Sequence, residues 1–463
     1  MKLLLERGDV NPNSSDKQGR TPLLFAAKGP VLTSFEDPVC APSLAALGND
    51  GVVKLLLERG NVNPNSADSD GRTPLSFAAE GGYEGVVKLL LHRRDVNPNS
   101  PDNSARTSLS FAAARGHERV VKLLLERGDV NPNFPDSNDR TPLSFAASEG
   151  HGGVVKLLVE RGDVNPDSSD SNGQTPLLFA IVRADQCVVK LLLQRGDVNP
   201  NSSDSKGRRP LSFAAASGHE GVVNLLLARE DVDPNSPDSD DRTPLSFAAE
   251  RGHEGVVKLL LARGDVDPNS ADSDGRTSLS FAAERGQEGV VELLLERGDV
   301  DPNSADSDGQ TPLSFAAKSG PKGVVRLLLQ RGDINPNLSD KQGRTPLWFA
   351  AERPMLKPSR GPLGALSPAA LRNDGVVKLL LARGDVDPNS RDSDGRTLLS
   401  FAAERGREDV AKLFLERGDA DPNSPDSDGR TPLSFAASGG HRSVVKLLLA
   451  RGDVDPNSVD SDG

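Results

Sequence analysis

The chain has 463 residues, and 55 basic against 67 acidic side chains give it a formal net charge of −12. This acidic balance argues against a general binder of nucleic acid or of anionic membranes, because both need a basic face. Its two cysteines, Cys40 and Cys187, lie far apart, so neither a disulfide framework nor a metal-ligand spacing is indicated. Apolar runs are too short for a signal peptide or a membrane span, so we expect an intracellular protein, with the cytoplasm favoured over the nucleus.

One pattern recurs along the whole chain. It centres on Thr-Pro-Leu or a variant of it, and it begins at residues 21, 73, 107, 141, 175, 209, 243, 277, 311, 345, 397 and 431. Successive starts are 34 residues apart, except that the steps from 21 to 73 and from 345 to 397 are 52. We therefore predict one array over residues 1–463, with twelve repeat starts and two repeats that each contain an 18-residue insertion.

The first helix of a repeat can be predicted from the unit that starts at Thr243. The Thr243 hydroxyl suits an N-cap, and Pro244 suits the first helical position, where its missing N–H costs nothing. The stretch 245–249, Leu-Ser-Phe-Ala-Ala, supplies an apolar side with two small residues. Gly252 can adopt the left-handed conformation that ends a helix, so we expect a helix of about two turns.

A second helix and a loop complete the unit. The helix is expected from about Glu254 to Gly264, with Lys258 facing outward from an apolar side of valines and leucines. The loop that follows runs extended before Pro268, and the sequence Asp-Ser-Asp-Gly at 272–275 predicts a tight turn. Helices this short become stable only when they stack on their neighbours, so the predicted fold is an all-α solenoid of helix-turn-helix units with protruding hairpin loops.

The full pattern resembles the ankyrin repeat over nearly the whole chain. It is Asp-x-x-Gly-Arg-Thr-Pro-Leu-Ser-Phe-Ala-Ala-x-x-Gly-His-Glu-x-Val-Val-x-Leu-Leu-Leu-x-x-Gly, as at 272–298 and its neighbours. Two features depart from the usual repeat: serine, as in Ser246 and Ser314, replaces a histidine, and the loop between repeats is one residue longer. Both features are similar to the near-identical ankyrin arrays of filamentous fungi, which often form the C-terminal arm of NACHT-type signalling proteins.

The resemblance implies a non-enzymatic scaffold that binds a protein partner, with no cofactor and no small-molecule substrate. In such arrays the partner is held along a concave surface by the loop tips and the ends of the first helices. The Asp and Arg side chains there also fit a merely solvated surface, and Trp348 fits either an exposed anchor or a packed side chain. The candidate partner-binding residues are Arg72, Glu80, Val182, Arg183, Asp240, Arg242, Glu250, Asp274, Arg276 and Trp348.

Three functional hypotheses remain open at this point. The chain is the recognition arm of a larger signalling protein, a regulatory or targeting module of a catalytic domain on a longer parent chain, or a structural adaptor. The segments 1–15 and 454–463 are a partial repeat and an incomplete hairpin, so we expect a fragment of a longer protein or a chain that needs a neighbour at each end.

The two insertions lie within segments 29–50 and 353–374, and several of their residues match at an offset of 324, which indicates that a block of repeats was duplicated. They are projecting recognition loops, tolerated surface loops or unremoved introns.

Other chemistry is not favoured by the sequence. Five of the six histidines recur in the turn between helices, where we expect each to be satisfied by nearby backbone. The Asp-x-Asp-Gly turns lack the final glutamate of a calcium loop, since Phe315 stands in its place. In the recurrent Arg-Gly-Asp, as at Arg263, we expect the arginine to complement the negative end of its own helix and the glycine to cap it. Cys187 is expected to be a small packed residue.

Overall fold

A computed structural model describes residues 11–29, 49–352 and 374–458. It divides into two compact units, each of which is described by itself. Unit 1 comprises residues 1–214 and 219–233, and unit 2 comprises residues 215–218 and 234–463. The predicted partial repeat at 1–15, both insertions and the end of the C-terminal hairpin fall largely or wholly outside the described residues.

Unit 1 alternates the first and second helices of successive repeats. Its helices are α2 (Pro22–Ala27), α4 (Asp50–Leu57), α5 (Pro74–Glu80), α6 (Glu84–Leu91), α7 (Ser108–Ala114), α8 (Glu118–Glu126), α9 (Pro142–Glu149), α10 (Gly152–Val159), α11 (Pro176–Val182), α12 (Gln186–Leu193) and α14 (Glu220–Leu227). Helix α13 (Pro210–Ser217) begins in unit 1, and its last residues belong to unit 2.

Unit 2 repeats the same alternation. Its helices are α15 (Pro244–Arg251), α16 (Glu254–Leu261), α17 (Ser278–Arg285), α18 (Glu288–Glu296), α19 (Pro312–Ser319), α20 (Lys322–Gln330), α21 (Pro346–Ala351), α22 (Asp374–Leu381), α23 (Leu398–Glu404), α24 (Glu408–Arg417), α25 (Pro432–Ser438) and α26 (Arg442–Leu449). The predicted all-α array of paired short helices with a period of about 34 residues is confirmed.

The first helices begin and end as their sequences predict. At α15 the Thr243 hydroxyl accepts the backbone N–H of Ser246 at 3.3 Å, and Pro244 opens the helix. Gly252 then adopts a left-handed conformation, with φ of 76°, and its N–H bonds to the last turn. The Ser246 hydroxyl turns back to donate to the Thr243 carbonyl at 2.8 Å, so this buried serine is satisfied inside its own helix.

The second helices differ from the prediction at their ends, except that α24 does end at a left-handed glycine, Gly418. Helix α16 runs from Glu254 to Leu261, and Gly264 is not among the residues with positive φ, so the prediction that the helix runs to Gly264 and is capped by it is wrong. The cause lies in the next repeat. Arg297 donates from Nη1 to the carbonyl of Leu261 at 3.0 Å and thereby satisfies a backbone group at this helix end.

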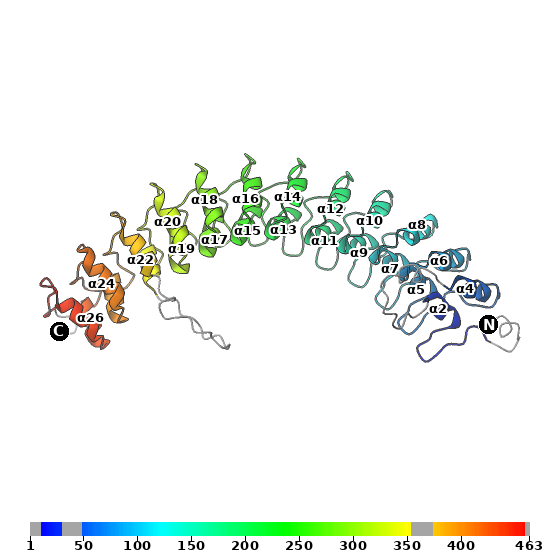
Figure 1. Cartoon of the computed structure of the whole chain (residues 1–463), viewed down its shortest axis with the longest axis horizontal. Coiled ribbons are helices and arrows are strands. Elements are labelled where there is room, and N and C mark those ends of the chain that lie inside the picture. The colour runs from blue at the N-terminus through cyan, green and yellow to red at the C-terminus, as the bar shows by residue number, and fades with distance from the viewer. Residues whose placement is uncertain (1–10, 30–48, 353–373, 459–463) are drawn as a thin grey trace, which may run out of the picture. The chain divides into compact units, whose positions relative to one another are not determined.

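The core of each unit is a thin double layer of helices. In unit 2, α15, α17 and α19 pack side by side in one layer, and α16, α18 and α20 form the other (Figure 1). Leu245, Ala248 and Ala249 of the first helix and Val257 and Leu260 of the second are all buried, whereas Lys258 faces outward as predicted. Since the layer is thin, each helix pair is stabilised mainly by burial against its neighbours.

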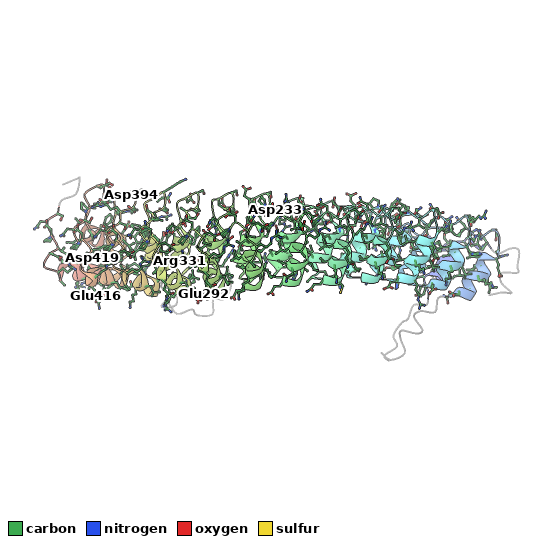
Figure 2. All side chains as sticks on the ribbon, turned by 90° about the horizontal axis from the view of Figure 1, so that it is seen from above. Asp233, Glu292, Arg331, Asp394, Glu416 and Asp419 are labelled. Atoms are coloured by element: carbon green, nitrogen blue, oxygen red, sulfur yellow. The ribbon has the colours of Figure 1, made fainter. Side chains whose placement is uncertain are left out.

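The turns between repeats form a separate edge. Asp272 accepts the N–H groups of Asp274 and Arg276 with one carboxylate oxygen, at 3.1 and 2.8 Å, so the predicted tight turn is confirmed. An antiparallel bridge between Ala271 and Thr277 closes the small hairpin. In unit 2, Asp394 in a turn and Glu416 near the end of α24 lie toward opposite edges (Figure 2).

Candidate partner-binding face

Arginine and phenylalanine side chains alternate along the first helices of unit 1. The Arg72 guanidinium lies 3.8 Å from the ring centre of Phe77 in its own repeat and 4.4 Å from that of Phe111 in the next. Arg106 repeats the arrangement between Phe111 and Phe145, at 4.1 and 4.9 Å. Such distances are those of cation–π contacts, which here run from one repeat to the next. We call this surface of unit 1 the Arg–Phe face: Arg72, Phe77, Arg106, Phe111, Arg140, Phe145 and Phe179.

Unit 2 carries the same arrangement. Arg242 lies 4.1 Å from the ring centre of Phe247 and 4.5 Å from that of Phe281. Arg276 lies 4.2 Å from Phe281 and 4.7 Å from Phe315. Two of the predicted binding residues, Arg242 and Arg276, are therefore held rigidly between rings, with only their outer edges available for other contacts.

A glutamate at the end of the first helix completes several of these stacks. Arg72 pairs with Glu80, Arg242 with Glu250 at 2.6 Å, and Arg276 with Glu284 in the same way. These glutamates lie eight residues after their arginines, so each pair spans the whole first helix. Of the predicted candidates, Arg72 and Glu80 are thus partners of one another, as are Arg242 and Glu250.

A second arginine reaches each of two glutamates from the next repeat. Arg115 approaches Glu80 at 3.1 Å, and Arg285 approaches Glu250 at 2.9 Å. Burial acts to raise the pKa of Glu80 and Glu250, but the hydrogen bonds from the arginines outweigh it, and both pKa values lie below the usual range. Both carboxylates therefore stay ionised at neutral pH.

The remaining candidates occupy different surroundings. Asp240 and Asp274 lie at exposed turn tips, where their backbone carbonyls accept the N–H groups of Ser273 and Ser307 in the following repeats, at 3.0 and 2.7 Å. Val182, at the end of α11, is 56% exposed, which is unusual for an aliphatic side chain in this array. Its neighbour Arg183 donates to the carbonyl of Ser148 at 3.3 Å in the preceding repeat.

Trp348 is packed and not exposed. Only 3% of it is accessible, and its ring lies 5.2 Å from that of Phe401 in the next repeat. Of the two alternatives, the packed side chain is the one that the structure has. The tryptophan still lines a cavity of about 260 Å³ together with Phe401 and the charged side chains of Arg344, Arg396 and Arg405.

Comparison with known protein families decides what this array is. Residues 37–102, 94–168, 162–238, 223–306, 298–357 and 366–460 match a family model described as ankyrin repeats in three copies. The chain belongs to the ankyrin-repeat family. No curated protein matches it. Ankyrin repeats are in general protein–protein interaction modules and are typically non-catalytic, so this array has protein partners as its expected ligands.

The longer loop of these ankyrin repeats holds a row of asparagines that the sequence analysis did not identify. The Asn65 amide donates to the carbonyl of Asp95 at 2.6 Å, and its oxygen accepts the N–H of Asn97 at 2.9 Å. Asn99 and Asn133 make the same pair of bonds to the loops that follow them. Each loop is thereby tied to the next, and the recurrent Pro-Asn at a fixed spacing was the signal that could have revealed it.

The asparagine row continues in unit 2. There it is formed by Asn235, Asn269, Asn303, Asn337, Asn389 and Asn423. Because a side-chain amide both donates and accepts, one asparagine satisfies two backbone groups of the neighbouring loop.

The turn histidines are satisfied by backbone, as predicted. His117 donates from Nε2 to the carbonyl of Glu80 at 2.8 Å, and His441 donates to that of Glu404 at the same distance. Gln287, which stands at this position in another repeat, reaches the carbonyl of Glu250 at 3.2 Å. The part of the chain that the structure describes contains no cluster of three or more metal-ligating side chains.

Three further findings concern single residues and membrane contact. The prediction that Cys187 is packed is wrong: it lies exposed in the first turn of α12, on the side away from the buried Val188 and Val189.

The arginine of Arg-Gly-Asp caps the second helix of the preceding repeat and not its own, as Arg161 shows by donating to the carbonyl of Leu125 at 3.0 Å. None of the described helices is long and apolar enough to cross a membrane.

Proposed function

We propose that this chain is a non-enzymatic scaffold that holds a protein partner along the Arg–Phe face and its counterpart in unit 2. The observation that carries the proposal is the arrangement of this face. Its arginines are oriented in advance between rings, while the residues at the first-helix ends vary among Glu80, Val182, Lys318 and Ser438. A rigid frame with variable side chains at its ends suits recognition, because little conformational entropy is lost on binding.

Site-directed photo-cross-linking tests this proposal. A photoreactive amino acid replaces Val182 or Ser438, both exposed at first-helix ends, and the full chain is irradiated in an extract of its source cells. The matched controls carry the same group at Lys190 or Lys446, which are exposed on the second helices of the same two repeats. The proposal requires a discrete adduct from the first pair that the second pair does not give. Equal labelling from both pairs, or none from the first, would overturn it.

The wider role that we propose is the recognition arm of a larger intracellular signalling protein. Support comes from the similarity of the repeats, with serine after Thr-Pro-Leu and a lengthened loop, to fungal ankyrin arrays. Sequencing of the gene and its transcript upstream of Met1 tests this. A continuous reading frame that encodes a nucleotide-binding domain is expected, whereas a hydrolase or kinase domain would instead make the array a targeting module.

A further inference from the structure

Three successive repeats of unit 1 lack the acidic side chains that several other repeats carry at two positions of this face. At the turn tip, Ser104, Asn138 and Asn172 stand where Asp70, Asp240 and Asp274 stand elsewhere. At the first-helix end, Ala114, Ser148 and Val182 stand where other repeats have Glu80, Glu250 and Glu284. Both kinds of carboxylate are therefore missing from the same stretch of the Arg–Phe face.

The loss leaves two stacked arginines without a carboxylate. Among the described residues, the Arg106 guanidinium forms no ion pair and donates no hydrogen bond, although it is held between Phe111 and Phe145. Arg140 is stacked in the same way, and its guanidinium donates only to the Ser148 hydroxyl, at 2.9 Å. Arg72, one repeat earlier, has Glu80 in the place that is vacant for Arg106.

The acids that remain near these arginines are mostly engaged. Asp102 accepts the N–H groups of Ser104 and Arg106, and Asp136 does the same for the next turn. Asp139 is exposed at the turn, where it replaces a glycine with φ of 63°. The burial of Arg106 lowers its pKa, which indicates that its positive charge is poorly compensated.

An apolar surface adjoins the two arginines. Gln174 takes the place of the arginine in the third repeat, so Phe179 is covered by Arg140 on one side only and is half-buried. The 56% exposed side chain of Val182 lies on the same helix, three residues further on. Guanidiniums with unused donors therefore stand beside an aliphatic and aromatic patch within one unit.

We propose that this stretch binds an acidic segment of the partner protein. One carboxylate takes the missing glutamate's place on Arg106, a second takes it on Arg140, and an aliphatic side chain lies on Phe179 and Val182. The proposal deepens and rests on the proposed function, since it names the partner chemistry of the same face. A guanidinium edge pairs with a carboxylate through two parallel hydrogen bonds, and the rings already fix both guanidiniums in position.

The spacing of the repeats sets the spacing of the ligand. Adjacent helix layers lie about 10 Å apart, and an extended chain covers roughly that distance in three residues. The bound segment thus carries acidic residues at i and i+3 and an aliphatic residue at i+6. Two cations beside an apolar patch, in a chain of net charge −12, suit a short acidic peptide better than a long polyanion such as nucleic acid.

Fluorescence anisotropy with the full chain tests the proposal. The probe is a labelled peptide of sequence Glu-Ser-Ser-Glu-Ser-Ser-Leu, used alongside its reversed sequence, a version with glutamine for glutamate, and a labelled single-stranded oligonucleotide. The wild-type chain is expected to bind one of the two acidic peptides, more weakly as salt rises, and to bind the glutamine peptide about tenfold less tightly. Tighter binding of the oligonucleotide, or equal binding of the glutamine peptide, would refute it.

Two sets of variants locate the site. The double variant A114E/S148E supplies Arg106 and Arg140 with the internal carboxylates that Arg72 has, so it should fold and lose about tenfold in peptide affinity. The control K190E places a carboxylate at an exposed position of α12, a second helix of the same unit, and should bind the peptide normally. Unchanged affinity of A114E/S148E would contradict the proposal.

A second double variant keeps the test decisive if A114E/S148E fails to fold. R106Q/R140Q introduces the glutamine that the chain itself has at Gln174, and it should lose affinity as A114E/S148E does, with thermal melting by circular dichroism as the check on folding. If it binds the peptide like the wild type, the inference is wrong. The photo-cross-links described above would be unaffected by that result, so the proposed function would stand or fall separately.

Discussion

Asp167 accepts the backbone N–H of Asn199 through both carboxylate oxygens, at 3.1 and 3.0 Å. Every other repeat has asparagine at this position. Asn133, one repeat earlier, makes the equivalent contact to Asn165 and also donates to the carbonyl of Asp163 at 2.6 Å. An ionised aspartate has no proton to donate, so the row of asparagine bonds loses one link here.

The substitution Asp167→Asn should therefore stabilise the chain. We expect a gain of about 1 kcal/mol in the free energy of unfolding, the usual net value of one hydrogen bond. Urea denaturation followed by circular dichroism measures it. Asn133→Asp is the matched control and should lose a similar amount; if the two changes fail to act in opposite directions, the asparagine bonds do not stabilise the loops.

The same residue gives a dependence on pH. Burial disfavours the charged form of Asp167 and raises its pKa above the ordinary value. The folded chain thus holds this proton more tightly than the unfolded chain, so the stability from Asp167 is fully present below the unfolded pKa of about 3.9 and is lost as pH rises through the folded pKa.

The free energy of unfolding should accordingly differ more between the wild type and Asp167→Asn as pH rises from 4 toward 7. Denaturation of both proteins across this range measures the difference directly, and it cancels the contribution of other carboxylates. A difference that stays constant, or shrinks, with rising pH would show that Asp167 titrates alike in both states.

His117 ties two repeats through its bond to the Glu80 carbonyl. Replacing it with leucine leaves that carbonyl without its partner and should cost about 1 kcal/mol. His117→Gln should be close to neutral, because Gln287 makes the same contact in another repeat. Thermal melting of the two variants distinguishes a hydrogen-bonding role from a steric one, in which glutamine and leucine would behave alike.

Arg297 closes the end of the preceding repeat's second helix, and a pair of hydrogen bonds to Asp299 holds its side chain in place. The substitution Arg297→Ala should cost about 1–2 kcal/mol, because it leaves the Leu261 carbonyl at the end of α16 without its donor. Hydrogen exchange should quicken at the end of α16. Lys258→Ala, at an outward position on that helix, should change neither the free energy of unfolding nor the exchange rate. If it changes both as much as Arg297→Ala does, Arg297 has no special role in capping α16.

The sequence predicted the structure correctly where the deciding contacts lie within one repeat. Thr243, Pro244 and Gly252 specify a helix start and stop through bonds within one repeat, and all three act as expected. It was a poor guide wherever the partner comes from the next repeat. Gly264 was a poor guide to the end of α16, because Arg297 supplies the cap from a position 33 residues further on.

The candidate face shows the same division. The repeat pattern singled out Arg72 and Glu80 as candidates, but it did not show that they pair with each other or that Arg72 stacks on rings of two repeats. Nor could it show that Arg106 lacks a carboxylate partner, because this lack is recognised only when the surroundings of Arg106 are compared with those of Arg72. Cys187 was assigned to the interior from its residue type and its place in a second-helix segment, but it lies on the exposed side of α12.

The missing bond at Asp167 also affects how unit 1 comes apart. In an array where each repeat contacts only its neighbours, separation starts at the interface with the smallest coupling energy. The loop of Asp167 joins its successor by one kind of bond, where the loop of Asn133 before it is joined to its own successor by two. Under tension or mild denaturant, the repeats up to this loop should therefore be released as one cooperative block, with Asp167 at the point of fracture.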